Sequence, residues 1–430
     1  MIEQLYKKYQ ESGFNVSTDS RNIEKGSLFF ALNGPNFNAN KYAKQAIEKG
    51  ANFAVIDNSA YTIAGKTILV NNSLKALQEL ALFHRNQFSI PIIGITGSNG
   101  KTTSKELIGA VLKTTFKTLI TQGNFNNHIG VPLTLLRLRP HHQIAIIEMG
   151  ANHIGEIKEL SKISNPNYGI ITNIGVAHIE GFGSIEGVKK TKKELYDYIS
   201  ENNGTIFCNE DDSVLKGIIP NNTLNAFYGK KSKTIKGEII KLDPFINFKW
   251  NSKDYQSEAL TTNLIGEYNF YNFLLAISIG HHFKVESKKI SDSLSSYQPT
   301  NNRSQVEKTA HNTVIVDCYN ANPTSTLAAL ESFNRVEKAN KMVILGDMLE
   351  LGDISFNEHQ KIIDYLTKNN IKGFTVGQEY EKVAANYKNF KTVEQLMVFL
   401  SSNPIQKNSF LLIKGSRGIQ LEKLISSKTI

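Results

Sequence analysis

Short apolar runs alternate with helical sequence from one end of this chain to the other. SLFFAL at residues 27–32 precedes a helical segment that ends at Gly50, and IPIIGIT, QIAIIEMG, TVIVDCYN and SFLLIKGSRG repeat the pattern farther along. Strands that alternate with helices are typical of parallel sheets whose faces are covered by helices. The pattern therefore predicts an α/β fold built on parallel sheets.

The chain has 430 residues, enough for about three domains at roughly 150 residues each. We place a small N-terminal α/β domain at residues 1–85 and a central parallel-sheet domain at 86–304. A third, Rossmann-like domain is predicted at 305–430. Residues 234–250 are strand-like and are expected to form a β appendage to the central domain.

Composition and charge narrow the class of protein. Hydrophobic residues make up 40% and charged residues 20%, which excludes disorder as the main state. The net charge of +10 is compatible with nucleic acid, a membrane surface or small anionic substrates. No apolar stretch is long enough to span a membrane, and only Cys208 and Cys318 are present. We therefore expect a cytoplasmic protein without a disulfide framework.

The segment PIIGITGSNGKTTSKELI carries the strongest chemical signal. A buried strand, a glycine-rich turn and a helix follow one another in the order that a phosphate-binding loop requires. Gly97 and Gly100 allow backbone N–H groups to approach anionic oxygens, Lys101 supplies a positive charge, and Thr102 or Thr103 can hold Mg²⁺. The strict P-loop spacing is not met, so the loop is a variant. It predicts a nucleoside triphosphate ligand, and the alternative is a glycine-rich turn formed by chance.

Two further strands end in residues that are suited to metal binding. Glu148 ends QIAIIE, and His178 follows the strand IITNI. Ligands of α/β sheets bind at the carboxyl ends of the strands, so both side chains are expected near the phosphate loop. Alternatively, Glu148 is a solvated charge at a strand end, and His178 is a hydrogen-bonded polar residue.

Motifs along the whole chain resemble those of the Mur ligases of peptidoglycan synthesis. They include TGSNGKTT, TQGNFNNHIGVPLTLL, EMGANHIGEI, NIGVAHIEGFGSIEGV, VDCYNANP, LGDMLELG and KGSRG. The resemblance implies that residues 1–85 bind a UDP-sugar (UDP-MurNAc), that 86–304 bind ATP, and that 305–430 close over the site. GNFNNHIG together with YNANP and LGDMLELG is typical of the member that joins D-Ala-D-Ala to UDP-MurNAc-tripeptide through an acyl phosphate.

The same resemblance implies roles for individual residues. Catalysis would involve Lys101, Glu148, His178 and Lys192. Of two Mg²⁺ ions, Thr102 and Glu148 would hold one and His178 would help to hold the other. Lys192 resembles a lysine that is carbamylated in relatives to bridge the metals. ATP would contact Thr96, Gly97, Ser98, Asn99, Gly100, Lys101, Thr102, Thr103, Asn269, Asn272, Arg303 and Asp317. The other substrates would contact Ser20, Arg21, Asn124, Asn126, Asn127, Tyr319, Asn320 and Asn322.

Other functions stay open from the sequence. One is another ATP-dependent amide ligase, of a sister Mur type or of the folylpolyglutamate type. A second, from a different class, is a P-loop ATPase stimulated by nucleic acid, which the basic charge would suit. No motif combines aromatic and basic residues for nucleic-acid stacking, so we expect no nucleic-acid partner. We also expect no membrane span, and nothing in the sequence requires more than a monomer.

Overall fold

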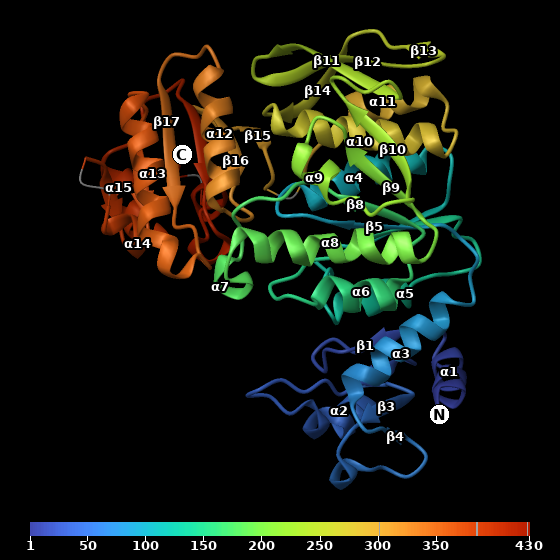
Figure 1. Ribbon diagram of the computed structural model, residues 1–430. Coiled ribbons are helices and arrows are strands. Elements are labelled where there is room, and N and C mark those ends of the chain that lie inside the picture. The colour runs from blue at the N-terminus through green and yellow to red at the C-terminus, as the bar shows by residue number, and fades with distance from the viewer. Residues whose placement is uncertain (301, 384–385, 428) are drawn as a thin grey trace.

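The computed structural model describes residues 1–430 except 301, 384–385 and 428. It contains three sheets in succession along the chain, and helices pack on the sheets (Figure 1). The predicted three-domain α/β architecture is therefore confirmed. None of the helices in the described part is long and apolar enough to cross a membrane.

The N-terminal sheet is parallel throughout and has the strand order β1-β2-β3-β4. Its strands are short because the domain is small. The helix α3 leads from it toward the central domain and packs against α5 and α6 of that domain (Figure 1). The elements are α1 (Ile2–Glu11), β1 (Val16–Ser17), β2 (Leu28–Phe30), α2 (Ala43–Glu48), β3 (Phe53–Ile56), β4 (Thr67–Leu69) and α3 (Ser73–Arg85).

The central sheet has the order β13-β12-β11-β10-β9-β8-β5-β7-β6, with β14 also paired to β12. Strands β6 to β11 and β5 run parallel, whereas β12, β13 and β14 are antiparallel. The predicted appendage is thus a continuation of the central sheet. The strands are β5 (Ile92–Thr96), β6 (Thr118–Ile120), β7 (Ile144–Glu148), β8 (Tyr168–Ile171), β9 (Thr205–Asn209), β10 (Leu224–Gly229), β11 (Ile235–Leu242), β12 (Phe245–Ser252), β13 (Tyr255–Gln256) and β14 (Leu260–Ile265).

Helices cover both faces of the central sheet because nearly every parallel strand is apolar on both sides. One face packs against α4, α10 and α11, and the other against α5, α6 and α8. The helices are α4 (Lys101–Lys113), α5 (Gly130–Leu135), α6 (Glu156–Ser164), α7 (Ile179–Phe182), α8 (Ile185–Glu201), α9 (Ser213–Gly217), α10 (Tyr268–His282) and α11 (Ser287–Ser296).

The C-terminal sheet has the order β15-β16-β20-β17-β18-β19 and is parallel except for the edge strand β15. Because β20 lies between β16 and β17, the loops that follow these three strands meet at one edge of the sheet. The elements are β15 (Gln305–Lys308), β16 (Thr313–Asp317), α12 (Pro323–Arg335), β17 (Lys341–Gly346), α13 (Ser355–Lys368), β18 (Lys372–Val376), α14 (Gln378–Glu381), β19 (Lys388–Phe390), α15 (Val393–Ser402), β20 (Phe410–Lys414) and α16 (Lys423–Ser426).

Candidate functional site

The glycine-rich loop connects β5 to α4 in the middle of the central sheet. Gly97 has φ +143°, and a Cβ atom there would lie 2.0 Å from the hydroxyl oxygen of Thr172. Gly100 has φ +78° and is the N-cap of α4, where no side chain caps the first turn. Only glycine suits both positions, and the free N–H groups at the start of α4 are a ready site for an anion.

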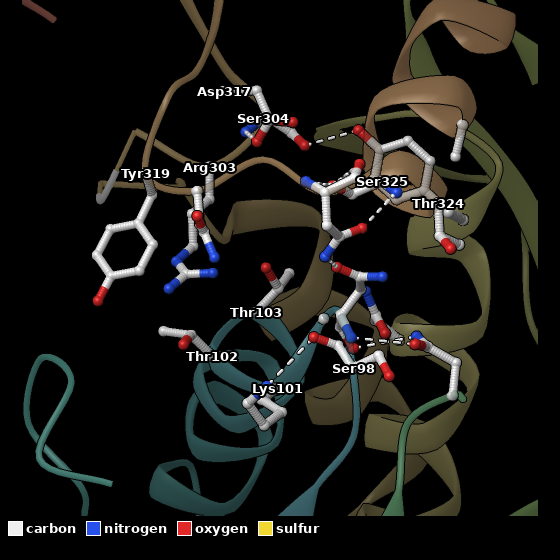
Figure 2. Close-up of a pocket in the computed structure, with 18 of the residues that line it drawn as sticks. Ser98, Lys101, Thr102, Thr103, Arg303, Ser304, Asp317, Tyr319, Thr324 and Ser325 are labelled. Atoms are coloured by element: carbon white, nitrogen blue, oxygen red, sulfur yellow. Dashed lines mark hydrogen bonds between the residues drawn. The ribbon is translucent and has the colours of Figure 1, made fainter. Parts of the chain in front are cut away.

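Lys101 is the first residue of α4 and bends back over the loop. Its Nζ donates hydrogen bonds to the carbonyl oxygens of Gly97 at 2.6 Å and Ser98 at 3.3 Å. Loss of water around the half-buried ammonium lowers the pKa of Lys101 to about 8, an effect that Glu148 opposes and Arg303 reinforces. Figure 2 shows Lys101 at one side of a cavity with Arg303 and Tyr319 across from it.

Glu148 ends β7, the strand next to β5, and its carboxylate is buried beside the loop. One oxygen, Oε1, accepts hydrogen bonds from Thr102 Oγ1 at 3.2 Å and from Asn126 Nδ2 at 2.8 Å. The other, Oε2, lies 3.4 Å from the ammonium of Lys105 and has no hydrogen-bond partner among the described residues. A buried carboxylate oxygen without a hydrogen bond is costly, so this oxygen is poised to take a ligand.

The oxygen donors of Thr102 and Glu148 suit Mg²⁺, which prefers oxygen ligands and usually keeps waters and substrate phosphates in its shell. Within the described residues, no three His, Cys, Asp or Glu side chains are grouped as a metal site. The residues present therefore fit a cation that is bound by one carboxylate, one hydroxyl and phosphate oxygens, rather than a cage made only of protein groups.

His178 has a left-handed backbone, with φ +51°, and precedes α7. Its Nδ1 pairs with the carboxylate of Glu350, which lies in the loop after β17 of the C-terminal domain. The pairing lowers the pKa of Glu350, chiefly through the hydrogen bond with His178. A carboxylate on one ring nitrogen fixes the orientation of the imidazole, and Nε2 has no hydrogen-bond partner in the part of the chain that the structure describes.

Lys192 lies on α8 and is buried, with its Nζ 5.3 Å from the centre of the Phe182 ring. Burial lowers the pKa of Lys192 well below its usual value, and the charge of Lys101 lowers it further. Its Nζ makes no hydrogen bond or ion pair within the described part of the chain. It lines neither of the cavities described below.

Asn269 and Asn272 are buried on the first turns of α10, beside the glycine-rich loop. Asn272 Nδ2 donates to Asn269 Oδ1 at 2.8 Å, and Asn272 Oδ1 accepts from Ser104 Oγ at 2.9 Å. Both line the same cavity as Lys101. The structure thus brings these two predicted ATP contacts to the phosphate loop.

Residues of the C-terminal domain close the cavity from the opposite side (Figure 2). Asp317 Oδ2 pairs with the buried Lys414 at 2.7 Å, and Asp317 Oδ1 accepts from the backbone N–H of Ser304 at 3.1 Å. The guanidinium carbon of Arg303 lies 3.7 Å from the centre of the Tyr319 ring. Loops after strands of two different sheets therefore face each other across one site.

Direct contacts join the two sides. Asn322 Nδ2 donates to Asn99 Oδ1 at 2.7 Å, and the N–H of Val176 donates to Thr324 Oγ1 at 3.0 Å. Asn322 is also the N-cap of α12, with a reciprocal bond to Ser325. These bonds place the C-terminal domain directly over the glycine-rich loop.

Two adjoining cavities result. One, of about 260 Å³, contains the glycine-rich loop, the α10 asparagines and the C-terminal residues. The other, of about 680 Å³, runs along the GNFNN loop and the start of α6. The residues that line both cavities are Lys101, Asn126, His178 and Tyr319.

Not every predicted site residue lies at these cavities. Arg21 is 88% exposed and pairs with Asp19 in the N-terminal domain, and Ser20 accepts from Lys49 through its carbonyl. Asn124 and Asn127 line the larger cavity, but the Asn127 side chain accepts two backbone N–H groups at the start of α5. Asn127 therefore fixes the turn before α5 in addition to lining the cavity.

Sequence reasoning missed three charged residues of the site: Lys105, Glu350 and Lys414. Lys105 follows Lys101 by one helical turn, so its side chain lies on the same face of α4. Glu350 and Lys414 belong to LGDMLELG and KGSRG, which were recognised as motifs without a role for these side chains. Only the strand order of the C-terminal sheet shows that both motifs meet YNANP.

Comparisons with known proteins agree with this geometry. Residues 95–280 match the Mur ligase middle domain and residues 302–417 match the Mur ligase glutamate ligase domain. The UDP-N-acetylmuramoyl-tripeptide–D-alanyl-D-alanine ligase of Bacillus subtilis is 32% identical over 95% of this chain and 92% of its own. The Rickettsia prowazekii ligase of the same name is 34% identical over 95% and 94%.

Solved structures give the same result. A crystal structure of MurF from Acinetobacter baumannii superimposes with a TM-score of 0.88 at 31% identity, and covers 96% of this chain and 93% of that one. MurF from Thermotoga maritima, solved with ADP, shares the fold with a TM-score of 0.85 at 24% identity, over 96% and 97%. The chain belongs to the Mur ligase family, in the group of UDP-N-acetylmuramoyl-tripeptide–D-alanyl-D-alanine ligases.

Proposed function

We propose that this protein uses ATP to join D-Ala-D-Ala to UDP-MurNAc-tripeptide, a step of peptidoglycan precursor synthesis. The observation that carries the proposal is the pair of adjoining cavities that share Lys101, Asn126, His178 and Tyr319. One cavity contains the phosphate loop, and the other, of about 680 Å³, would take the second substrate. A carboxylate in the larger cavity would therefore meet the γ-phosphate of ATP at the shared residues.

The first step is transfer of the γ-phosphoryl group to the tripeptide carboxylate, which gives an acyl phosphate and ADP. Such a transfer depends on positioning and on charge neutralisation. Lys101 and the first turn of α4 would hold the phosphates, and Arg303 would approach them from the other side. Asn269 and Asn272 would contact the adenine, and Asp317 the ribose.

Thr102 and Glu148 would hold Mg²⁺, which would neutralise phosphate charge when bound. His178, and Lys192 as a carbamate, would serve a second ion. The lowered pKa of Lys192 supports this assignment, because a neutral amine is the form that adds to CO₂.

In the second step the amine of D-Ala-D-Ala attacks the acyl carbon, and phosphate leaves from the tetrahedral intermediate. The loop of Tyr319, Asn320 and Asn322 would position this dipeptide. Water would hydrolyse the acyl phosphate, so the bonds of Asn322 and Thr324 to the central domain have a chemical purpose: they hold the site closed during the reaction.

We assign residues 1–85 to the UDP-sugar, 86–304 to ATP and 305–430 to the dipeptide. Ser20 and Arg21 would contact the UDP moiety, and Asn124, Asn126 and Asn127 the muramoyl part. Cys208 and Cys318 are buried thiols, which suits the reducing cytoplasm, and we propose that the enzyme acts there as a monomer.

Phosphate release from ATP tests the proposal directly. We expect release with UDP-MurNAc-tripeptide to depend on D-Ala-D-Ala, and Lys101→Ala to lower kcat by about 100-fold or more. Lys113→Ala is the matched control, because Lys113 is exposed in the last turn of the same helix. Release that ignores the dipeptide, or normal ligation by Lys101→Ala, would rule the proposal out.

A further inference from the structure

The proposed acceptor carries a charge that the reaction does not consume. D-Ala-D-Ala reacts through its amine, while its terminal carboxylate remains free in the product. A carboxylate leaving water needs a cationic partner with hydrogen-bond donors, and arginine suits it best because its planar guanidinium can donate two parallel bonds. The site should therefore hold a cation that is left unpaired by the protein itself.

Most cations around the two cavities are already engaged. Lys414 pairs with Asp317, Lys105 with Glu148, and His178 with Glu350. Lys101 belongs to the phosphate loop and donates to its carbonyl groups. Each of these side chains would have to give up a partner within the protein to take a second anion.

Two arginines remain, and both lie beside the Tyr319 ring. The guanidinium carbon is 3.7 Å from the ring centre for Arg303 and 5.7 Å for Arg417. Neither side chain forms an ion pair within the part of the chain that the structure describes. Arg303 lowers the pKa of Lys101 and lines the cavity of the phosphate loop, whereas Arg417 is exposed, lines neither cavity and lies beside them through Tyr319.

The fold explains why Arg417 comes to Tyr319. Tyr319 follows β16 and Arg417 follows β20, and these strands are direct neighbours. The loop after β17, the other neighbour of β20, is bound to the same place, since the N–H of Leu349 donates to Ser416 Oγ at 2.9 Å and that of Ser416 donates to the carbonyl of Asp347 at 3.1 Å. Three loops therefore meet in one small area beside Tyr319, which lines both cavities.

This area combines one charge with apolar surface. Leu349 is 42% exposed, although it is a large apolar side chain. Its Cδ1 would lie 3.0 Å from a Cβ atom at Gly418, so Leu349 lies directly beside the backbone that follows Arg417. A guanidinium near a tyrosine ring, with an exposed leucine beside the adjoining backbone, matches a ligand with a carboxylate and small methyl groups.

We propose that Arg417 binds the terminal carboxylate of the incoming dipeptide, with Tyr319 and Leu349 against its methyl groups. The proposal rests on the proposed function and adds a specificity determinant to it. The enzyme should accordingly prefer acceptors that end in a carboxylate over otherwise identical neutral ones. Arg303 would bind the ATP phosphates and Arg417 the dipeptide carboxylate, so each arginine binds a different anion.

The test compares D-Ala-D-Ala with its C-terminal amide, which has the same amine and no negative charge. The wild-type enzyme should use the acid with a kcat/KM roughly 10- to 100-fold higher than the amide. In Arg417→Gln we expect this ratio to fall to about one, through a higher KM for the acid, while the KM for ATP stays unchanged. Arg417→Lys should restore part of the ratio, because it keeps the charge but not the paired donors.

Arg335→Gln is the matched control. Arg335 is an exposed arginine of the same domain that pairs with Glu267 at 2.7 Å, and its loss should leave the acid-to-amide ratio intact. A ratio that persists in Arg417→Gln, or a wild-type enzyme that does not discriminate at all, overturns the proposal while ligation itself stands. A wild-type enzyme that ligates neither acceptor refutes the proposed function instead, and with it this inference.

Discussion

The central domain meets its two neighbours through two interfaces, or seams, that differ in character. Toward the N-terminal domain the seam is apolar: a single hydrophobic core runs from Leu5 and Tyr9 through Leu80 to Leu135 and Ile157. Toward the C-terminal domain the apolar contact is small. Among the described residues, only Ile265 and the partly buried Phe245 of the central domain pack into the hydrophobic core of the C-terminal domain. The N-terminal and central domains therefore share one hydrophobic core, whereas the C-terminal domain has a largely separate one.

The hydrogen bonds at the two seams differ in the same way. At the apolar seam, polar groups complete a packed surface, as when the Tyr9 hydroxyl donates to the carbonyl of Leu136 and Arg139 donates to that of Phe14 at 2.8 Å. At the polar seam, bonds such as Asn322 to Asn99 stand beside a cavity. Polar contacts exchange readily with water and contribute little net stability, so this seam can open for substrates at modest cost.

The largest effect should come from the core of the apolar seam. Leu80 on α3 is fully buried, and Leu80→Ala should lower the free energy of unfolding by about 3 kcal/mol, from lost burial plus the cavity left behind. Chemical denaturation measures it, and Val398→Ala, which truncates a side chain 72% exposed on α15, should change stability by less than about 0.5 kcal/mol. Equal stabilities for both variants would show that the seam does not hold the domains together.

Lowering the pH should have a smaller effect on stability, through His84 at the apolar seam. His84 is buried, with Nδ1 3.1 Å from the Tyr6 hydroxyl and Nε2 3.1 Å from the carbonyl of Leu138. Burial lowers the pKa of His84 to about 4. The unfolded chain therefore binds more protons than the folded one between pH 6.5 and 4, and stability contributed by neutral His84 is lost as the pH falls through that window.

We expect this residue to remove about 2 kcal/mol of stability between pH 7 and pH 4.5. Unfolding measured across this range should therefore depend less on pH in His84→Gln than in the wild-type protein. His141→Gln is the control, since His141 is exposed. If His84→Gln follows the wild-type pH dependence, another group is responsible.

The fold could be predicted largely from the sequence because its signals are local. A strand such as Ile92–Thr96 and the turn of Gly97 and Gly100 are encoded by adjacent residues, and the apolar pattern sets the helix faces. The extension of the central sheet by residues 234–250 was predicted as strands, but not its place in the sheet. Strand pairing depends on long-range contacts, which no local pattern specifies.

The site likewise contains residues that local sequence predicts and residues that it does not. The glycine-rich loop predicts Lys101 and Thr102, a strand end predicts Glu148, and the three lie within one cluster. Glu350, Lys414 and Arg417 could not be placed, because their position follows from the order β16-β20-β17. Arg21 shows the converse: the resemblance implies a substrate contact, but the side chain is exposed, pairs with Asp19 and lines neither of the two cavities.

The polar seam should respond to mutation in activity and hardly at all in stability. The carboxylate of Glu350 in the C-terminal domain pairs with His178 of the central domain, and the Glu350 side chain is 55% exposed. Glu350→Ala should lower kcat by about tenfold, because the imidazole loses the group that orients it, and should change the free energy of unfolding by less than about 0.5 kcal/mol, as is usual for exposed pairs. Glu186→Ala, which removes an exposed carboxylate at the start of α8, should alter neither quantity. A Glu350→Ala protein that loses stability in proportion to its activity would mean that the polar seam holds the domains as the apolar seam does, and the contrast between the two would fail.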